Sequence, residues 1–318
     1  MKKTIFFISL LSYISIFAQP CNNGWEYRLP INIINNGAAL TNHQISFNIN
    51  TQSLIVSGKM NSFGNDIRIK DVFGADLPFW IEEGTINTTN TVIWVKASNI
   101  GLVNDSIYLF YGNNTASSAS NGLNTFELFD TFNGNSLNTS YWNYCGSLPS
   151  VVGGNITLSR GASNNSYISS IQTLSDTITI ESKINSVNSS TSYLGLYSQA
   201  NTLGWAIAKQ TIGANELMKL ANISPSVSNC LNIQSQTSSS NTVNAASING
   251  IWSLSWIEND SLVFSWPSGN EIREDNQYSS EFSQNKHIVL GVDALVGGMS
   301  VSWIRARKYT KQQPIASI

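Results

Sequence analysis

Short runs of residues that favour β-strands dominate the sequence, and this pattern restricts the chain to an all-β fold. In these runs Val, Ile, Tyr, Phe, Trp and Thr alternate with polar residues, while Asn, Gly, Ser and Asp separate the runs. Four examples are residues 27–34, 43–50, 91–97 and 106–112. Helical periodicity is almost absent after the first eighteen residues. Many short strands at a spacing of roughly 8–12 residues predict β-sandwiches or a jelly roll.

The N-terminus has the layout of a secretory signal peptide, residues 1–18. Two lysines precede an apolar run over residues 4–17, and the small residue Ala18 ends it. The run is too short for a membrane-spanning helix, which needs about 20 apolar residues, and no later stretch approaches that length. We therefore expect cleavage after Ala18 and a secreted, periplasmic or cell-surface protein. Pro20 in front of Cys21 argues against a lipid anchor at that cysteine.

Charge is sparse, because Asp, Glu, Lys and Arg make up 11% of the chain against about 25% in an ordinary soluble domain. The net charge is −2, and the sequence has no cluster of Lys and Arg. Binding to a phosphate backbone or to an anionic membrane surface requires such a cluster. Nucleic acid is therefore excluded as a partner.

A polar stretch of small residues, 113–125, separates two groups of strand-like runs and predicts a domain boundary. We expect a first β-sandwich over residues 19–122 and a second domain over residues 123–318.

Three cysteines in an oxidising compartment allow one disulfide. Cys145 and Cys230 both fall in the second domain and are the predicted pair, which would leave Cys21 free. The alternative is three unpaired cysteines.

Residues 25–132 carry four sequence blocks that resemble a bacterial family named domain of unknown function 2341. The blocks are WEYRLPINI, GNDIRIKDVFGADLPFWIEEG, TVIWVKA and IYLFYGN, and they occur in the order and at the spacing of the family. Members of this family typically precede a laminin-G-like or concanavalin A-like domain. Residues 126–143 and 299–309 resemble the opening and closing strands of such a domain. The resemblance implies two β-sandwiches, the second a concanavalin A-like jelly roll.

Function does not follow from this fold, which includes lectins, adhesion modules and glycoside hydrolases. Similar domains often have Asp where this chain has Ser302. Any role that depends on this Asp is therefore not expected in this chain.

A retaining glycoside hydrolase needs two carboxyl groups about 5–5.5 Å apart, and hydrolases of this fold class place them on one strand at positions i and i+2. Glu181 is the lone acid of residues 177–184, and we expect it to face solvent beside Lys183. Glu258 and Asp260 have the i, i+2 spacing but lie in a predicted hairpin turn. The sequence therefore predicts no catalytic pair and a protein that is not an enzyme.

The acidic cluster of the second domain and the two histidines also give no sign of a catalytic site. Glu271, Glu274 and Asp275 form an acidic cluster that we expect in a solvated loop, with cation binding as the alternative. His43 and His287 fall in different domains, and neither is flanked by an acid and a nucleophile as a catalytic triad requires.

In the first domain, Asp66, Arg68, Asp71 and Glu82 stand out. We expect a structural ion-pair network between neighbouring strands, with a charged recognition patch as the alternative.

Aromatic side chains supply the positive signal for binding. The second domain contains six tryptophans, Trp142, Trp205, Trp252, Trp256, Trp266 and Trp303. Trp142 and Trp303 fall in the opening and closing motifs and are expected in the core. Trp205, Tyr193 and Tyr197 are the candidates for stacking on sugar rings, with Arg305 as a polar partner; the alternative is ordinary core packing.

The sequence thus predicts an exported, non-catalytic binding or adhesion protein that recognises extracellular glycan or a surface polymer through the second domain, with a protein partner as the alternative ligand. The first alternative is a glycoside hydrolase or lyase on the same fold. The second is a structural surface or matrix protein that associates through edge strands or Cys21. No cofactor is required, and if a metal is bound we expect calcium, with Asp130 and Asp293 as candidate ligands.

Overall fold

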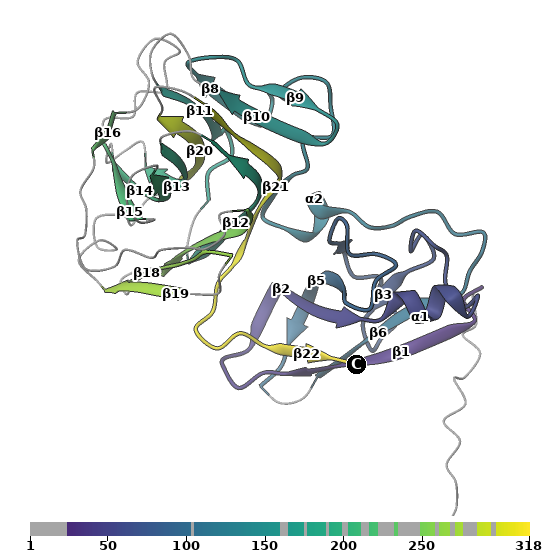
Figure 1. Cartoon of the computed structure of the whole chain (residues 1–318). Coiled ribbons are helices and arrows are strands. Elements are labelled where there is room, and N and C mark those ends of the chain that lie inside the picture. The colour runs from purple at the N-terminus through teal and green to yellow at the C-terminus, as the bar shows by residue number, and fades with distance from the viewer. Residues whose placement is uncertain are drawn as a thin grey trace, which may run out of the picture.

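The structure is a computed structural model. It describes residues 24–102, 105–159, 165–174, 177–188, 191–198, 203–210, 216–221, 232–234, 249–257, 261–267, 271–275, 285–293 and 297–318. The predicted signal peptide, Cys21, Cys230, Glu258 and Asp260 lie outside these ranges. Figure 1 shows two all-β units, so the predicted fold class is confirmed. No helix in the described ranges is long and apolar enough to cross a membrane.

The first unit is a sandwich of two antiparallel sheets with the strand orders β22-β1-β6-β3 and β2-β5-β4. Its strands are β1 (Tyr27–Ile34), β2 (Leu40–Ile49), β3 (Arg68–Lys70), β4 (Phe79–Ile81), β5 (Thr91–Ile100), β6 (Asp105–Tyr111) and β22 (Ile315–Ser317). The helix α1 (Thr51–Val56) follows β2. Side chains on a strand point alternately to its two faces, and this determines which ones enter the core. On β1, Ile31 and Ile33 are buried, whereas their neighbours Asn32 and Ile34 are exposed.

The second unit is the larger sandwich, and it has the two-sheet architecture of a jelly roll. One sheet has the order β19-β18-β17-β12-β21-β10-β9, with β7 also paired to β21, and the other has the order β16-β15-β14-β13-β20-β11-β8. The first sheet contains β7 (Leu128–Asp130), β9 (Ser150–Val152), β10 (Asn155–Ser159), β12 (Ile178–Val187), β17 (Gly250–Ile257), β18 (Ser261–Ser265), β19 (Glu271–Asp275) and β21 (Gly298–Lys308). The second contains β8 (Trp142–Cys145), β11 (Asn165–Ser170), β13 (Thr191–Ser198), β14 (Leu203–Gln210), β15 (Glu216–Ala221), β16 (Asn232–Gln234) and β20 (His287–Asp293).

Large aromatic side chains fill the interior of this second sandwich. Trp142 is buried in its core, and Trp303 is buried in a separate aromatic cluster, so the expectation that both are buried is confirmed. Trp252 and Trp266 pack edge to face with ring centroids 4.8 Å apart. The acidic cluster that we expected in a loop lies on a strand instead: Glu271–Asp275 forms β19, which pairs with β18 at the edge of the sheet.

The short helix α2 (Gly122–Thr125) lies where the two units meet, at the predicted boundary. The predicted C-terminal limit of the second domain, residue 318, was wrong. After β21 the chain crosses back through residues 309–314, here called the return segment, and β22 joins the first sandwich (Figure 1). There Ile315, Ala316 and Ser317 pair with Ile34, Ile33 and Asn32 of β1. The two units are therefore joined by two separate segments of chain.

This arrangement makes a local prediction for β22. Removal of residues 315–318 leaves the outer edge of β1 unpaired over residues 32–34, so we expect faster amide hydrogen exchange there and a melting temperature lower by a few degrees. Residues 27–31 pair only with β6 and serve as the internal control. Unchanged exchange over residues 32–34 would show that β22 contributes nothing to this edge.

Candidate functional site

The three aromatic residues predicted to stack on sugar are buried. Tyr193 is 0% exposed, and Tyr197 and Trp205 are each 2% exposed. Trp205 packs between the two sheets of the second sandwich, while Tyr193 and Tyr197 pack with Tyr167 and Val289 in a smaller cluster. Strand alternation indicates which residues of a strand share a face, but it does not indicate what covers that face. As an open sugar-binding platform, this predicted site is wrong.

Arg305 was predicted to be a polar partner for a ligand, and it forms the centre of the junction between the two units instead. Its side chain is 2% exposed. Arg305 Nε donates to Glu181 Oε2 at 2.7 Å, and Nη1 donates to Glu82 Oε2 at 3.0 Å. Glu82 belongs to the first unit and Glu181 to the second, so one guanidinium links carboxylates of both.

Four aromatic rings surround this buried cation. The guanidinium carbon of Arg305 lies 4.3 Å from the ring centroid of Trp94 and 4.4 Å from that of Trp303. The rings of Phe126 and Trp80 lie 5.3 and 5.5 Å away. Aromatic faces attract cations, most strongly where water is excluded. We call these four rings, Arg305, Glu82 and Glu181 the Arg305 cluster.

Glu181 does not face solvent beside Lys183, as we expected, but is 7% exposed. Arg307 also reaches it, with Nη2 3.1 Å from Glu181 Oε1. Burial by itself would raise the pKa of Glu181, but the charges of Arg305 and Arg307 outweigh burial and lower this pKa to about 2. The carboxylate therefore stays ionised at neutral pH and has no proton to donate as a general acid.

The conspicuous charged residues of the first unit are structural, although not as the predicted ion-pair network. Asp66 is buried and accepts hydrogen bonds from the backbone N–H groups of Asn61 and Gly112. Asp71 accepts from two backbone N–H groups within its own turn. Arg68 donates to three backbone carbonyls. In this set, Glu82 is the residue that forms an ion pair, and its partner is in the other unit.

The predicted calcium ligands, Asp130 and Asp293, stay a prediction. Asp130 accepts from Phe132 N and Trp142 Nε1, both at 2.7 Å, so its two oxygens have structural partners. The side chain of Asp293 lies outside the described set. No group of three His, Cys, Asp or Glu residues that could hold a metal occurs within it. Ser302 shares hydrogen bonds with the side chains of Asn155 and Asn185.

Cys145 is disulfide-bonded. Its predicted partner, Cys230, lies outside the described residues, so the pairing stays a prediction.

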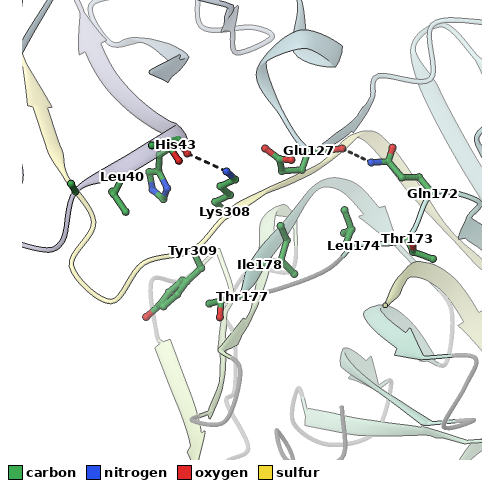
Figure 2. Close-up of a pocket in the computed structure, with 12 residues that line it drawn as sticks. Leu40, His43, Glu127, Gln172, Thr173, Leu174, Thr177, Ile178, Lys308 and Tyr309 are labelled. Atoms are coloured by element: carbon green, nitrogen blue, oxygen red, sulfur yellow. Dashed lines mark hydrogen bonds between the residues drawn. The ribbon is translucent and has the colours of Figure 1, made fainter. Parts of the chain in front are cut away.

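Three hollows surround the junction. The first, which we call the His43 cleft, has a volume of about 530 Å³. Figure 2 shows His43 and Leu40 of β2 on one side, Leu174 and Ile178 of the second unit on the other, and Lys308 between them. Burial lowers the pKa of His43, so its imidazole is neutral at pH 7.

The second hollow, of about 710 Å³, lies over the outer face of β12, β17 and β18. We call it the serine groove, because Ser253, Ser255 and Ser265 line it. Tyr309 of the return segment lines both this groove and the His43 cleft.

The third hollow, of about 310 Å³, takes its walls from both units on either side of α2. We call it the Tyr141 pocket. The residues that line it are Trp80, Glu83, Ser120, Asn121, Gly122, Leu123, Phe129, Asp130, Thr131, Asn133, Asn138 and Tyr141. Sequence reasoning did not select Tyr141, because the signal for it, an aromatic residue within a run of Asn and Ser, resembles an ordinary turn.

The Arg305 cluster predicts a large loss of stability on substitution. Arg305→Met leaves Glu82 and Glu181 buried without their shared partner, so we expect a loss of about 3–5 kcal/mol in the free energy of unfolding. The matched control is Arg28→Met, which removes an exposed arginine of β1 and should change this free energy by less than about 0.5 kcal/mol. Urea unfolding measures both, and similar small effects for the two variants would contradict the role of the cluster.

Acid should weaken the same cluster in a defined pH window. The pKa of Glu181 is about 2 in the folded chain against an ordinary value of 4.5. As the pH falls, the unfolded chain therefore takes up this proton before the folded chain does. The ionised carboxylate stabilises the folded chain by on the order of 3 kcal/mol above about pH 4.5, and this stabilisation is lost toward pH 2. We expect Glu181→Gln to flatten the dependence of unfolding free energy on pH across this window. Exposed Glu26→Gln is the control, and an unchanged slope in Glu181→Gln would refute the assignment.

Solved structures with a similar fold share little sequence with this chain. Beta-agarase A from Zobellia galactanivorans is 13% identical, with a TM-score of 0.43 over 59% of this chain and 90% of that one. The endo-beta-1,3-glucanase from Pyrococcus furiosus is 10% identical, with a TM-score of 0.41 over 58% of this chain and 94% of that one. A structure from work on endo-acting O-glycanases of the human gut microbiota is 12% identical, with a TM-score of 0.42 over 58% of this chain and 100% of that one. Similarity at this level concerns the fold alone.

No curated protein matches the sequence. Residues 63–145 match the family model described as Domain of unknown function (DUF2341), a span that begins before β3 and ends with β8 of the second unit. The resemblance to this family is thereby confirmed over residues 63–145.

Proposed function

We propose that this chain is an exported, non-catalytic glycan-binding protein and that the Tyr141 pocket holds the sugar. One observation carries the proposal: Tyr141 presents a 44% exposed aromatic ring at a polar hollow. The other exposed aromatic side chains of the described ranges, Phe63 and Phe73, line none of the three hollows. Sugar rings offer flat apolar faces that stack on such a ring, while their hydroxyl groups need polar partners.

The walls around Tyr141 provide those polar partners. Asn121, Asn133 and Asn138 are exposed amides that can both donate to and accept from hydroxyl groups. Asp130 is held in place by Phe132 N and Trp142 Nε1, and each of its oxygens keeps a lone pair for a sugar hydroxyl. The volume of about 310 Å³ lies at the lower end of the range of small-ligand sites, about 300–1,000 Å³. A short neutral saccharide fits this chemistry better than an anionic one, because the charged groups of the pocket are the carboxyl groups of Glu83 and Asp130.

Hydrolysis is the second candidate function, and the same two carboxyl groups favour it. Burial raises the pKa of Asp130, as expected for a general acid. Both oxygens of Asp130 accept structural hydrogen bonds, however, which ties this carboxyl group to Phe132 and Trp142. On β14, Ala206 and Ala208 occupy positions i and i+2 of one face and are both buried against Tyr193 and Tyr197. A catalytic pair at i and i+2 is therefore absent at these β14 positions.

Loss of the Tyr141 ring should weaken binding strongly. On a glycan array, we expect purified residues 19–318 to bind neutral glycans and Tyr141→Ala to lose at least about tenfold in affinity, because stacking contributes on the order of 1 kcal/mol beyond the buried area. Phe63→Ala, which removes an exposed ring outside the pocket, is the matched control. Equal binding by both variants, or no binding by folded protein, would overturn the proposal. Release of reducing ends from a polysaccharide panel, lost in Asp130→Asn, would establish hydrolysis instead.

A further inference from the structure

We infer that the opposite side of the junction, where the serine groove and the His43 cleft meet at the return segment, is a second binding site that takes an acidic polysaccharide. This site shares no residue with the Tyr141 pocket. It also differs from that pocket in charge, so the two sites are expected to select different ligands.

The two hollows form one face because the return segment lies between them. Tyr309 lines both. Gln313, which lines the serine groove, has its Oε1 3.4 Å from Nε2 of His43, which lines the cleft. Figure 2 shows the Tyr309 side chain projecting from the chain just beyond Lys308. A long ligand can therefore continue from one hollow into the other past this half-buried ring.

Cations predominate on this face. Lys183, Arg307 and Lys311 line the serine groove, and Lys308 lines the His43 cleft. The carboxylates among the lining residues already have basic partners: Glu181 pairs with Arg305 and Arg307, and Glu127 pairs with Lys96 at 3.1 Å. Since Arg307 is already paired with Glu181, the positive charge that this face offers a ligand comes from its lysines, Lys183 and Lys308 among them, in a chain with 11% charged residues and a net charge of −2. Anionic groups are the ligands that such a face attracts.

Hydroxyl groups line the serine groove together with these cations. On β17 the side chains of Trp252 and Leu254 point into the core, so the alternate residues Ser253 and Ser255 lie on the outer face. Ser253 pairs across the strands with Ser265 of β18. Ser255 is buried and its hydroxyl is hydrogen-bonded to Thr179 Oγ1 at 2.8 Å, so the half-buried Ser253 and Ser265 are the hydroxyls that can donate to and accept from a sugar chain.

A polysaccharide explains this face better than a nucleic acid does. Nucleic-acid backbones are bound by clustered Lys and Arg that neutralise successive phosphates. Here the cations are divided between two hollows on either side of the return segment, and serine hydroxyls lie among them. Carboxylate and sulfate groups on sugars share the chemistry that this face recognises, and the experiment distinguishes them.

Affinity electrophoresis in native gels tests the inference. Residues 19–318 are run in gels that contain polygalacturonate, dextran sulfate, neutral dextran or DNA. We expect retardation by one or both acidic polysaccharides, weakening as salt rises, and none by neutral dextran. Retardation by polygalacturonate alone would assign the site to uronates, and retardation by dextran sulfate alone would assign it to sulfated sugars.

Variants locate the site. Lys183→Gln and Lys308→Gln should each weaken retardation about two- to fivefold, as expected for one exposed charge pair, and Ser253→Glu should weaken it further by placing a negative charge in the groove. Lys59→Gln, an exposed lysine of the first unit outside both hollows, is the matched control. Melting temperatures confirm that every variant is folded.

Three results would overturn the inference: no retardation in any acidic gel, equal retardation by DNA, or equal weakening by Lys59→Gln. Tyr141→Ala separates the two sites. Acidic retardation that survives in this variant while neutral glycan binding is lost supports two sites, and loss of both would show that the Tyr141 pocket binds both ligands.

Discussion

The relative position of the two sandwiches depends on one buried cation. Arg305 bonds to Glu82 of the first unit and Glu181 of the second, and aromatic rings close around it. A buried guanidinium is expensive to desolvate unless its partners are well placed, so the cluster tolerates one arrangement of the two units and penalises others. Gln44 reinforces this arrangement, since its side chain accepts from Lys308 N and donates to Thr125 O. The His43 cleft and the Tyr141 pocket take their walls from both units and therefore depend on the cluster for their shape.

The return of the chain to the first sandwich adds a second constraint. Because β22 pairs with β1, the second unit is connected to the first at both of its ends. A unit connected in this way has less freedom to rotate than one on a single linker. The return segment also forms part of both the His43 cleft and the serine groove. The segment that restrains the two units thus also lines the face where we place the acidic ligand.

Strand periodicity predicted the fold and part of the core but could not predict the junction. Alternation identifies which residues share a face, as for Ile31 and Ile33, and the motif positions of Trp142 and Trp303 were sufficient to predict burial. At the positions of Glu181 and Arg305 the other unit covers the outer face of the strands, and nothing local to either strand reveals that cover. For the same reason the buried Trp205 and the exposed Tyr141 could not be told apart by composition. The three residues of β22 are too few for a pattern.

The Arg305 cluster also bears on the choice between binding and hydrolysis. A hydrolase of this kind needs one carboxyl group that keeps a proton near neutral pH and a second that is ionised and close to the substrate. Glu181 is ionised and covered, and its oxygens are occupied by Arg305 and Arg307. Glu82 is buried, and its Oε2 accepts hydrogen bonds from both Arg305 and Trp94. Glu82 and Glu181 thus hold the two units together, while the Tyr141 pocket offers a ligand exposed amides, a tyrosine ring and the carboxyl groups of Glu83 and Asp130. Amides and a tyrosine ring recognise sugars without attacking the bond between them, and this supports the proposal of binding.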